Sequence, residues 1–179
     1  MRWNGFVGSL VFGGVAALLY QPFLLWVGPT LGYRAAAAGF TILAATSYVA
    51  GSTKDTRRGL GGAFLLGTVA TFAAWVSHSP VVVAVLTIAG IGVVRSALLY
   101  SQPLGRTIFV EAALLMGSLA VGSYLVGTGP LGGAMAVWGV FLVQSVYYLI
   151  GGTAIAARTT VQRDPFDSAF QRAQRLLET

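Results

Sequence analysis

Charged residues are scarce in this sequence, and cysteine is absent from it. Lysine and arginine number 11 and aspartate and glutamate 5, so charged residues make up 9% of the 179 residues, against about 25% in a typical soluble domain. So few ionic side chains cannot build the solvated surface of a soluble domain. Hydrophobic residues make up 56% of the chain, and the mean hydropathy is +0.77. The composition therefore predicts an integral membrane protein.

These absences also exclude several kinds of chemistry. Without cysteine there is no disulfide framework, thiol chemistry or thiolate metal site. A single histidine, His78, excludes a bis-histidine haem within one chain, and Lys54, the only lysine, lies in a loop where no retinal-type Schiff base forms. The chain has no glycine-rich phosphate loop, HExxH motif or nucleophile elbow. We therefore expect no enzyme activity, no cofactor and no metal site.

Apolar runs long enough to span a bilayer occur six times, since a spanning helix needs about 20 mostly apolar residues. The expected spans are Gly5–Val27, Ala35–Gly51, Gly59–Val76, Val81–Leu99, Thr107–Gly127 and Leu131–Ala157. The fold class expected is an all-α six-helix transmembrane bundle over residues 1–157, followed by a short tail over residues 158–179. A secretory signal peptide is the competing interpretation of the first run, but that run continues past Tyr20 without a small-residue cleavage site.

Basic residues are distributed very unevenly between the two ends of these spans. With the N-terminus inside, ten of them lie on the inner side and one, Arg34, on the outer side. Cytoplasmic connections carry such an excess of lysine and arginine, so both termini should be cytoplasmic. The outer connections are then Gly28–Thr30, Ser77–Pro80 and Thr128–Pro130. We expect the cytoplasmic membrane of a bacterium or archaeon, with lipid as a partner and no nucleic acid, although the pI is near 10.2.

Small residues at a spacing of four predict close helix packing. Helices in lipid gain little from hiding leucine, so their backbones must approach closely for the bundle to hold together. The third span carries such a groove at Gly59, Ala63, Gly67 and Thr71. Packing within the bundle is one interpretation of the groove. The other is that it faces a second protomer or another subunit.

Arg95 and Glu111 form the candidate intramembrane ion pair. Charges inside a span are costly and usually find a partner or line a wet path. Arg95 comes late in the fourth expected span and Glu111 early in the fifth, on either side of a short turn. The structural interpretation is an ion pair that ties the two helices together. The functional one makes Glu111 a protonatable carboxylate in a solute or proton path.

The tail is the only segment with the sequence pattern of a soluble amphipathic helix, over about residues 165–178. Asp164 is placed as an N-cap, Pro165 follows it at the first helical position, and Arg172 and Arg175 lie near the C-terminal end of the helix. One face is apolar and is the candidate docking face: Phe166, Phe170, Ala173, Leu176 and Leu177. A helix of this length is marginal alone in water, so something must cover its apolar face. Lying on the bilayer is one option, but residues 158–179 carry a net charge of only +1, so we expect the helix to dock onto the cytoplasmic loops, a second protomer or a partner protein.

Two classes of function follow. The run Thr53–Gly59, with the glycine-rich stretch after it, resembles the membrane half of fusaric-acid-resistance or aromatic-acid exporters over about the middle third of the chain, and implies no residue roles. The first class is a non-catalytic subunit of a homo- or hetero-oligomeric membrane complex. The alternative is an exporter-like transporter or channel for a small solute or ion, with its conduit in the bundle or at an oligomer axis.

Overall fold

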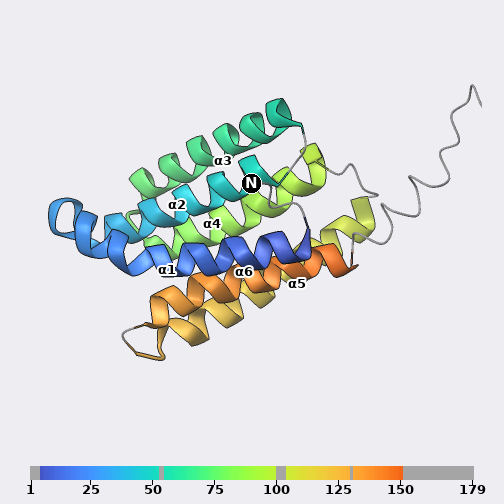
Figure 1. The fold of residues 1–179 in the computed structure, drawn as a ribbon. Helices are drawn as coiled ribbons and strands as arrows, with labels where there is room; N and C mark the ends of the chain where they lie inside the picture. Colours follow the sequence, from blue (N-terminus) through green and yellow to red (C-terminus); the bar gives the residue numbers. More distant parts are fainter. Residues whose placement is uncertain (1–4, 53–54, 100–103, 130, 151–179) are drawn as a thin grey trace, which may run out of the picture. The chain divides into compact units, whose positions relative to one another are not determined.

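The fold is all-helical in the part of the chain that a computed structural model describes, which is residues 5–52, 55–99, 104–129 and 131–150. Figure 1 labels the six α-helices in chain order. The elements are α1 (Phe6–Leu31), α2 (Tyr33–Gly51), α3 (Thr56–Ser77), α4 (Pro80–Val93) with the π-helical segment η1 (Val94–Leu99), α5 (Leu104–Val126) and α6 (Gly132–Ile150). No strand occurs within these ranges.

Four of the helices are long and apolar enough to cross a membrane: α1, α3, α5 and α6. Helix α4 is apolar but shorter, and α2 carries Arg34 in its first turn together with several alanine, glycine and hydroxyl residues. Helix α2 packs against α1, α3 and α4, so it needs less lipid-facing apolar surface than the outer helices do. The described residues are therefore all-helical, and their four long apolar helices support the membrane protein that the composition predicted.

The observed helices begin and end close to the expected spans, with one clear difference at the first connection. Gly28–Thr30 was expected to be a turn, and this prediction is wrong because α1 continues through Pro29 to Leu31. The Thr30 hydroxyl donates to the carbonyl oxygen of Val27 at 2.8 Å. The chain turns instead at Gly32, whose φ of +84° favours glycine.

A cluster of aromatic rings fills the core between α1, α2 and α6. The rings of Phe12, Tyr48 and Phe141 are mutually in contact, with centroids 5.0 to 5.5 Å apart. Tyr20 and Phe23 both pack against Phe40 further along the same helices. Aromatic pairs at such distances add to the stability that their buried area provides.

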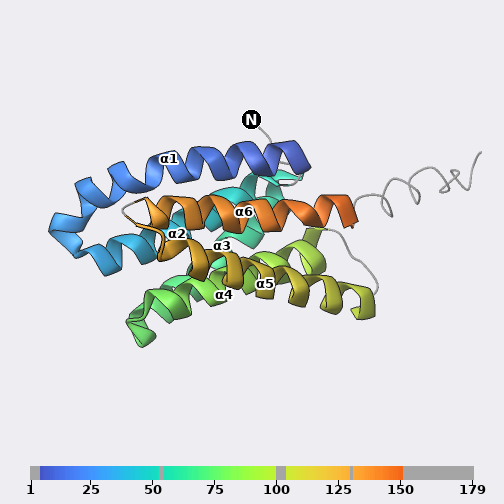
Figure 2. The same cartoon turned by 90° about the horizontal axis from the view of Figure 1, so that it is seen from below.

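Glycines allow the helices to approach one another at several crossings. A Cβ at Gly13 of α1 would lie 2.6 Å from Cβ of Phe141 on α6, and one at Gly139 of α6 would lie 2.7 Å from side-chain atoms of Val121 and Leu125 on α5. Helix α6 thus lies between α1 and α5, as Figure 2 also shows. Close backbone approach of this kind replaces the hydrophobic driving force that lipid removes.

The chain divides into two compact units, residues 1–147 and residues 148–179. Everything described below concerns the first unit. The expected tail helix over about residues 165–178, its docking face from Phe166 to Leu177, and the end of the sixth expected span at residues 151–157 lie outside the described residues.

Candidate functional site: a buried polar network

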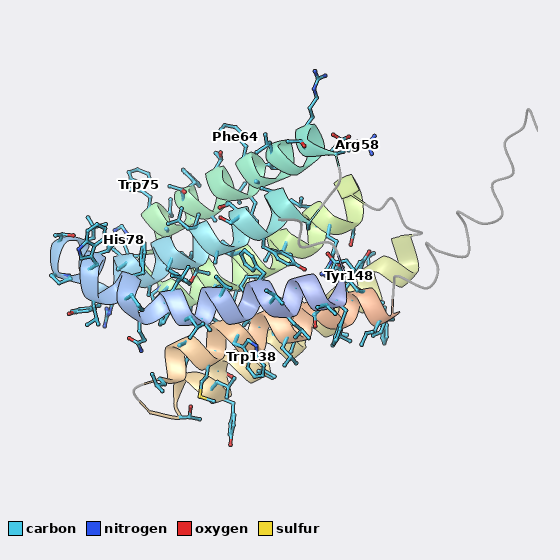
Figure 3. The ribbon with its side chains drawn as sticks, viewed as in Figure 1. Arg58, Phe64, Trp75, His78, Trp138 and Tyr148 are labelled. Atoms are coloured by element: carbon cyan, nitrogen blue, oxygen red, sulfur yellow. The ribbon has the colours of Figure 1, made fainter. Side chains whose placement is uncertain are left out.

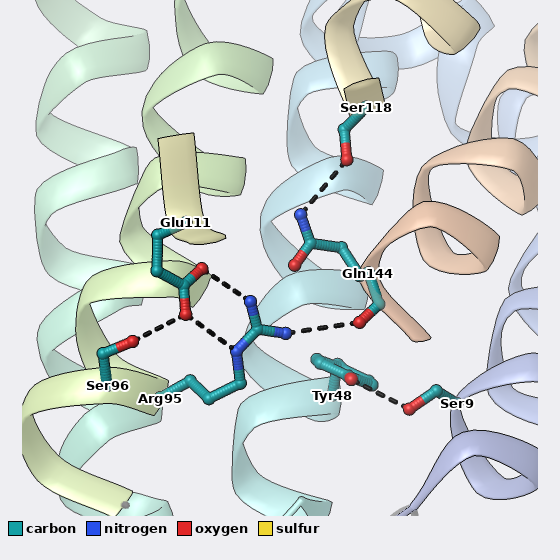
Figure 4. Close-up of polar contacts among 7 residues, drawn as sticks. All are labelled: Ser9, Tyr48, Arg95, Ser96, Glu111, Ser118 and Gln144. Atoms are coloured by element: carbon teal, nitrogen blue, oxygen red, sulfur yellow. Dashed lines mark hydrogen bonds and ion pairs between the residues drawn. The ribbon is translucent and has the colours of Figure 1, made fainter. Parts of the chain in front are cut away.

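The polar network is built around a change of helix type in α4. After Val93 the helix widens into the π-helical segment η1, which holds both Arg95 and Ser96. A π-turn closes with i→i+5 hydrogen bonds, and such turns inside α-helices occur frequently at functional sites. Both side chains contact Glu111 of α5, so two consecutive residues of one helix hold the same carboxylate (Figure 4).

Arg95 and Glu111 form a bidentate ion pair. Nη2 of Arg95 donates to Oε2 of Glu111 at 2.6 Å, and Nε donates to Oε1 at 3.2 Å. The Ser96 hydroxyl donates a third bond to Oε1 at 2.6 Å. The side chains of Arg95 and Glu111 are 3% and 16% exposed. Both carboxylate oxygens are therefore occupied by donors, as a buried ion pair requires.

Gly92 makes room for this carboxylate on α4. A Cβ at that position would lie 2.6 Å from Oε2 of Glu111 and 3.2 Å from its carboxyl carbon. A side chain at position 92 would occupy the space in which the Glu111 carboxylate lies when it pairs with Arg95. The glycine is thus part of the ion-pair site although it contributes no polar atom.

The network continues from Arg95 to α6. Nη1 of Arg95 donates to the main-chain oxygen of Gln144 at 3.4 Å, and the guanidinium carbon lies 3.9 Å from the centre of the Tyr147 ring, a cation–π contact. Nε2 of Gln144 in turn donates to the Ser118 hydroxyl on α5 at 3.1 Å. Three segments of the chain, η1, α5 and α6, are therefore joined through one arginine and one glutamine.

Glu111 is the only acidic residue within the helices α1–α6 and η1, and it pairs with Arg95 of η1. Asp55, Arg57 and Arg58 cluster at the start of α3, where the Asp55 carboxylate caps the helix by accepting from the main-chain N–H groups of Arg57 and Arg58. The positive charge of Arg95 and the negative charge of Glu111 cancel within the buried network. Within the described helices it offers no second carboxylate to continue a proton relay.

The expected small-residue groove of α3 is shared between the bundle and the outer surface. Gly59 is buried, Ala63 and Gly67 are half-buried, and Thr71 is exposed. A Cβ at Gly67 would lie 3.2 Å from Cγ2 of Thr46 on α2, so this part of the groove packs within the bundle.

The outer side of α3 carries a shallow apolar groove. It is lined by Phe64, Gly67, Thr68, Thr71, Phe72 and Trp75. Phe64, Phe72 and Trp75 are 78%, 64% and 73% exposed, and Figure 3 shows Phe64 and Trp75 on the side of α3 that faces away from α2.

Sequence reasoning had paired Arg95 with Glu111 but had not placed Ser96, Gly92 or Ser118 in the same site. Gly92 precedes Arg95 by three residues, which puts the two on one side of the helix and is the signal that could have linked them. Thr41 and Thr46 donate to the carbonyls of Ala37 and Ile42, within their own helix.

No protein-family model, curated protein or solved structure matches this chain. The likeness of the Thr53–Gly59 region to exporters is therefore one of sequence pattern alone.

Proposed function

We propose that this protein is a six-span membrane protein, with both termini in the cytoplasm, that acts as a non-catalytic subunit of a homo- or hetero-oligomeric membrane complex. The six helices alternate in direction along the chain, and together α4 and η1 are about as long as a bilayer core requires. The ten-to-one distribution of basic residues supports the orientation and a bacterial or archaeal cytoplasmic membrane.

The observation that carries this proposal is the self-contained ion pair. A transport path needs ionisable or polar groups that a passing solute or proton can reach, whereas Arg95 and Glu111 use their charges on each other. The ion pair that they form between η1 and α5 offsets the free-energy cost of placing two charges inside a membrane. The surface left for contact with another protein is on the outside of the bundle, above all the apolar groove on α3.

Cysteine crosslinking tests this proposal directly, because the natural chain contains no cysteine and needs no background removal. Thr71→Cys places a thiol in the α3 groove. Ala120→Cys is the matched control, since Ala120 is exposed on α5 at about the same number of residues from the start of its helix. We expect mild oxidation in native membranes to crosslink Thr71→Cys to a second copy or to a stoichiometric partner, and Ala120→Cys to neither.

The tail gives a second test of assembly. Its apolar face, expected from the sequence, would dock onto the complex, so Phe166→Ser with Phe170→Ser should reduce the size of the complex while leaving the six spans inserted. A protein that purifies as a monomer, forms no crosslink at Thr71→Cys and keeps its size after the tail change would overturn the subunit proposal.

The transporter or channel alternative has one observation in its favour. The polar network extends from Glu111 to Ser118 along α5, and it is built on a π-helical segment of the kind found at functional sites. Purified protein in liposomes distinguishes the two functions. Flux of a proton or small solute that is lost in Glu111→Gln would favour the alternative, whereas the subunit proposal expects no flux from the chain alone.

A further inference from the structure

Gln144 is the side chain from which the inference starts. It is 1% exposed, and Nε2 donates to the Ser118 hydroxyl. Its amide oxygen, Oε1, is buried and has no hydrogen-bond partner in the structure as described. Figure 4 shows the amide between Ser118 and the Arg95 guanidinium, with Nε2 turned toward Ser118.

Two neighbours of Gln144 have unused hydrogen-bond donors. A guanidinium carries five N–H groups, and Arg95 uses three of them, two on Glu111 and one on the main chain of Gln144. The Ser118 hydroxyl accepts from Gln144, and its own proton has no acceptor within the described ranges. Arg95 and Ser118 are 2% and 0% exposed. An unused acceptor and several unused donors are thus buried in one network.

Leaving these groups unmatched is costly, because an unsatisfied buried polar group loses its hydration and gains nothing in return. The cost persists in the hydrocarbon of a membrane, which supplies no hydrogen bonds. Internal waters typically make about three hydrogen bonds to groups of this kind. The set at this site, donors from Arg95 and Ser118 and an acceptor from Gln144, matches what one water molecule requires.

We infer that Arg95, Ser118 and Gln144 together bind one internal water molecule, which accepts from Arg95 and Ser118 and donates to Oε1 of Gln144. A cation is disfavoured by the guanidinium, and an anion by the amide oxygen. A small neutral molecule that both donates and accepts fits the mixed set.

The water has a structural consequence that does not depend on the proposed function. Ser118 lies seven residues beyond Glu111 on α5, or about 10 Å at 1.5 Å per residue. The ion pair and the Gln144–Ser118 pair are joined through the main-chain oxygen of Gln144, and the water adds a second link between them through side chains alone. The inner part of the bundle is then hydrated at one point although the helices around it are apolar.

Radiolytic footprinting of the intact protein tests this inference, because hydroxyl radicals generated from a bound water oxidise the side chains beside it. Tyr147 is the reporter, since its ring lies against Arg95 and is 3% exposed. Tyr48 is the matched control, since it is 1% exposed and its hydroxyl is hydrogen bonded to Ser9 at 2.9 Å. We expect several-fold more oxidation at Tyr147 than at Tyr48. Equal protection of the two rings would overturn the inference.

Gln144→Met and Ser118→Ala separate a bound water from access by bulk solvent. Each change removes one of the groups that hold the water, so oxidation of Tyr147 should fall in both variants, and persistent oxidation would mean that bulk solvent is its source. Gln144→Met should also lower the melting temperature, because it removes a satisfied acceptor. An unchanged or raised melting temperature would mean that Oε1 is an unpaired group and that no water is bound. Should Gln144→Met fail to fold, the smaller change at Ser118 still decides the question.

Discussion

Arg95 brings a full positive charge into the helix bundle with only 2% of its surface exposed. Its environment supplies an opposite charge from Glu111, an aromatic face from Tyr147 and a carbonyl oxygen from Gln144. Forming such a pair adds little net stability to the fold. Breaking it is costly, because the buried charge that remains has no counter-charge.

Glu111→Gln should lower the stability of the bundle by about 3–5 kcal/mol, since it leaves the Arg95 guanidinium without its counter-charge. Thermal melting in detergent measures the effect. Arg58→Gln is the control, because the Arg58–Asp55 pair is exposed at the start of α3 and should change stability by less than about 1 kcal/mol. Adding Arg95→Leu to Glu111→Gln should recover part of the loss. If Glu111→Gln leaves the melting temperature unchanged, and the double variant melts no higher than Glu111→Gln, the pair has no stabilising role.

Gly92→Ala should also be destabilising, because its Cβ would displace the carboxylate of Glu111 from Arg95. The control is Gly61→Ala on α3, where a Cβ meets nothing within 4 Å. In an open helical position the change from glycine to alanine stabilises by up to about 1 kcal/mol. The two substitutions are chemically identical, so opposite shifts in melting temperature would identify the carboxylate contact as the cause. Shifts of the same sign would argue against it.

At the scale of whole elements, the connection between α1 and α2 depends on Gly32. Its φ of +84° lies in a region that other residues rarely adopt, and no residue in the connection shares this role. Tyr33 then folds its ring over Gly28, where a Cβ would lie 2.6 Å from ring atoms. The hairpin therefore combines one glycine that turns the chain with another that accepts an aromatic ring.

Gly32→Ala should strain this hairpin by about 1–3 kcal/mol, the usual cost of a residue held in an unfavourable backbone region. Gly14→Ala, in the middle of α1 with no atom within 4 Å of the new Cβ, should not lower stability. Melting temperatures of the two variants provide the comparison. Equal stability of Gly32→Ala and the natural chain would mean that the connection relaxes without cost.

For the molecule as a whole, the orientation in the membrane can be measured with the same cysteine-free background. Thr128→Cys and Ser79→Cys lie in connections at one end of the helices, and Asp55→Cys lies at the other. Six spans with cytoplasmic termini predict that a membrane-impermeant maleimide, added outside intact cells, modifies the first two variants and not the third. Modification of all three, or of Asp55→Cys alone, would contradict this topology.

Several features of the fold followed from the sequence because they depend on local composition. Apolar runs bounded by glycine, proline and charge gave the helices to within a few residues, since a helix satisfies its own backbone wherever lipid surrounds it. Arg95 and Glu111 were matched in advance because a short turn makes their helices neighbours and an intramembrane charge needs a partner.

Other features were decided only by the tertiary structure, because they depend on which faces of distant helices meet. Pro29 looked like a turn residue, yet α1 passes through it because Gly32 offers a better place to reverse the chain. The spacing of three residues places Gly92 on the same side of α4 as Arg95, but only the packing of α5 against that side puts the Glu111 carboxylate there. Nothing local linked Gln144 to Ser118, 26 residues away. Sequence composition determined that these helices form, and close packing between them determined where the polar network lies.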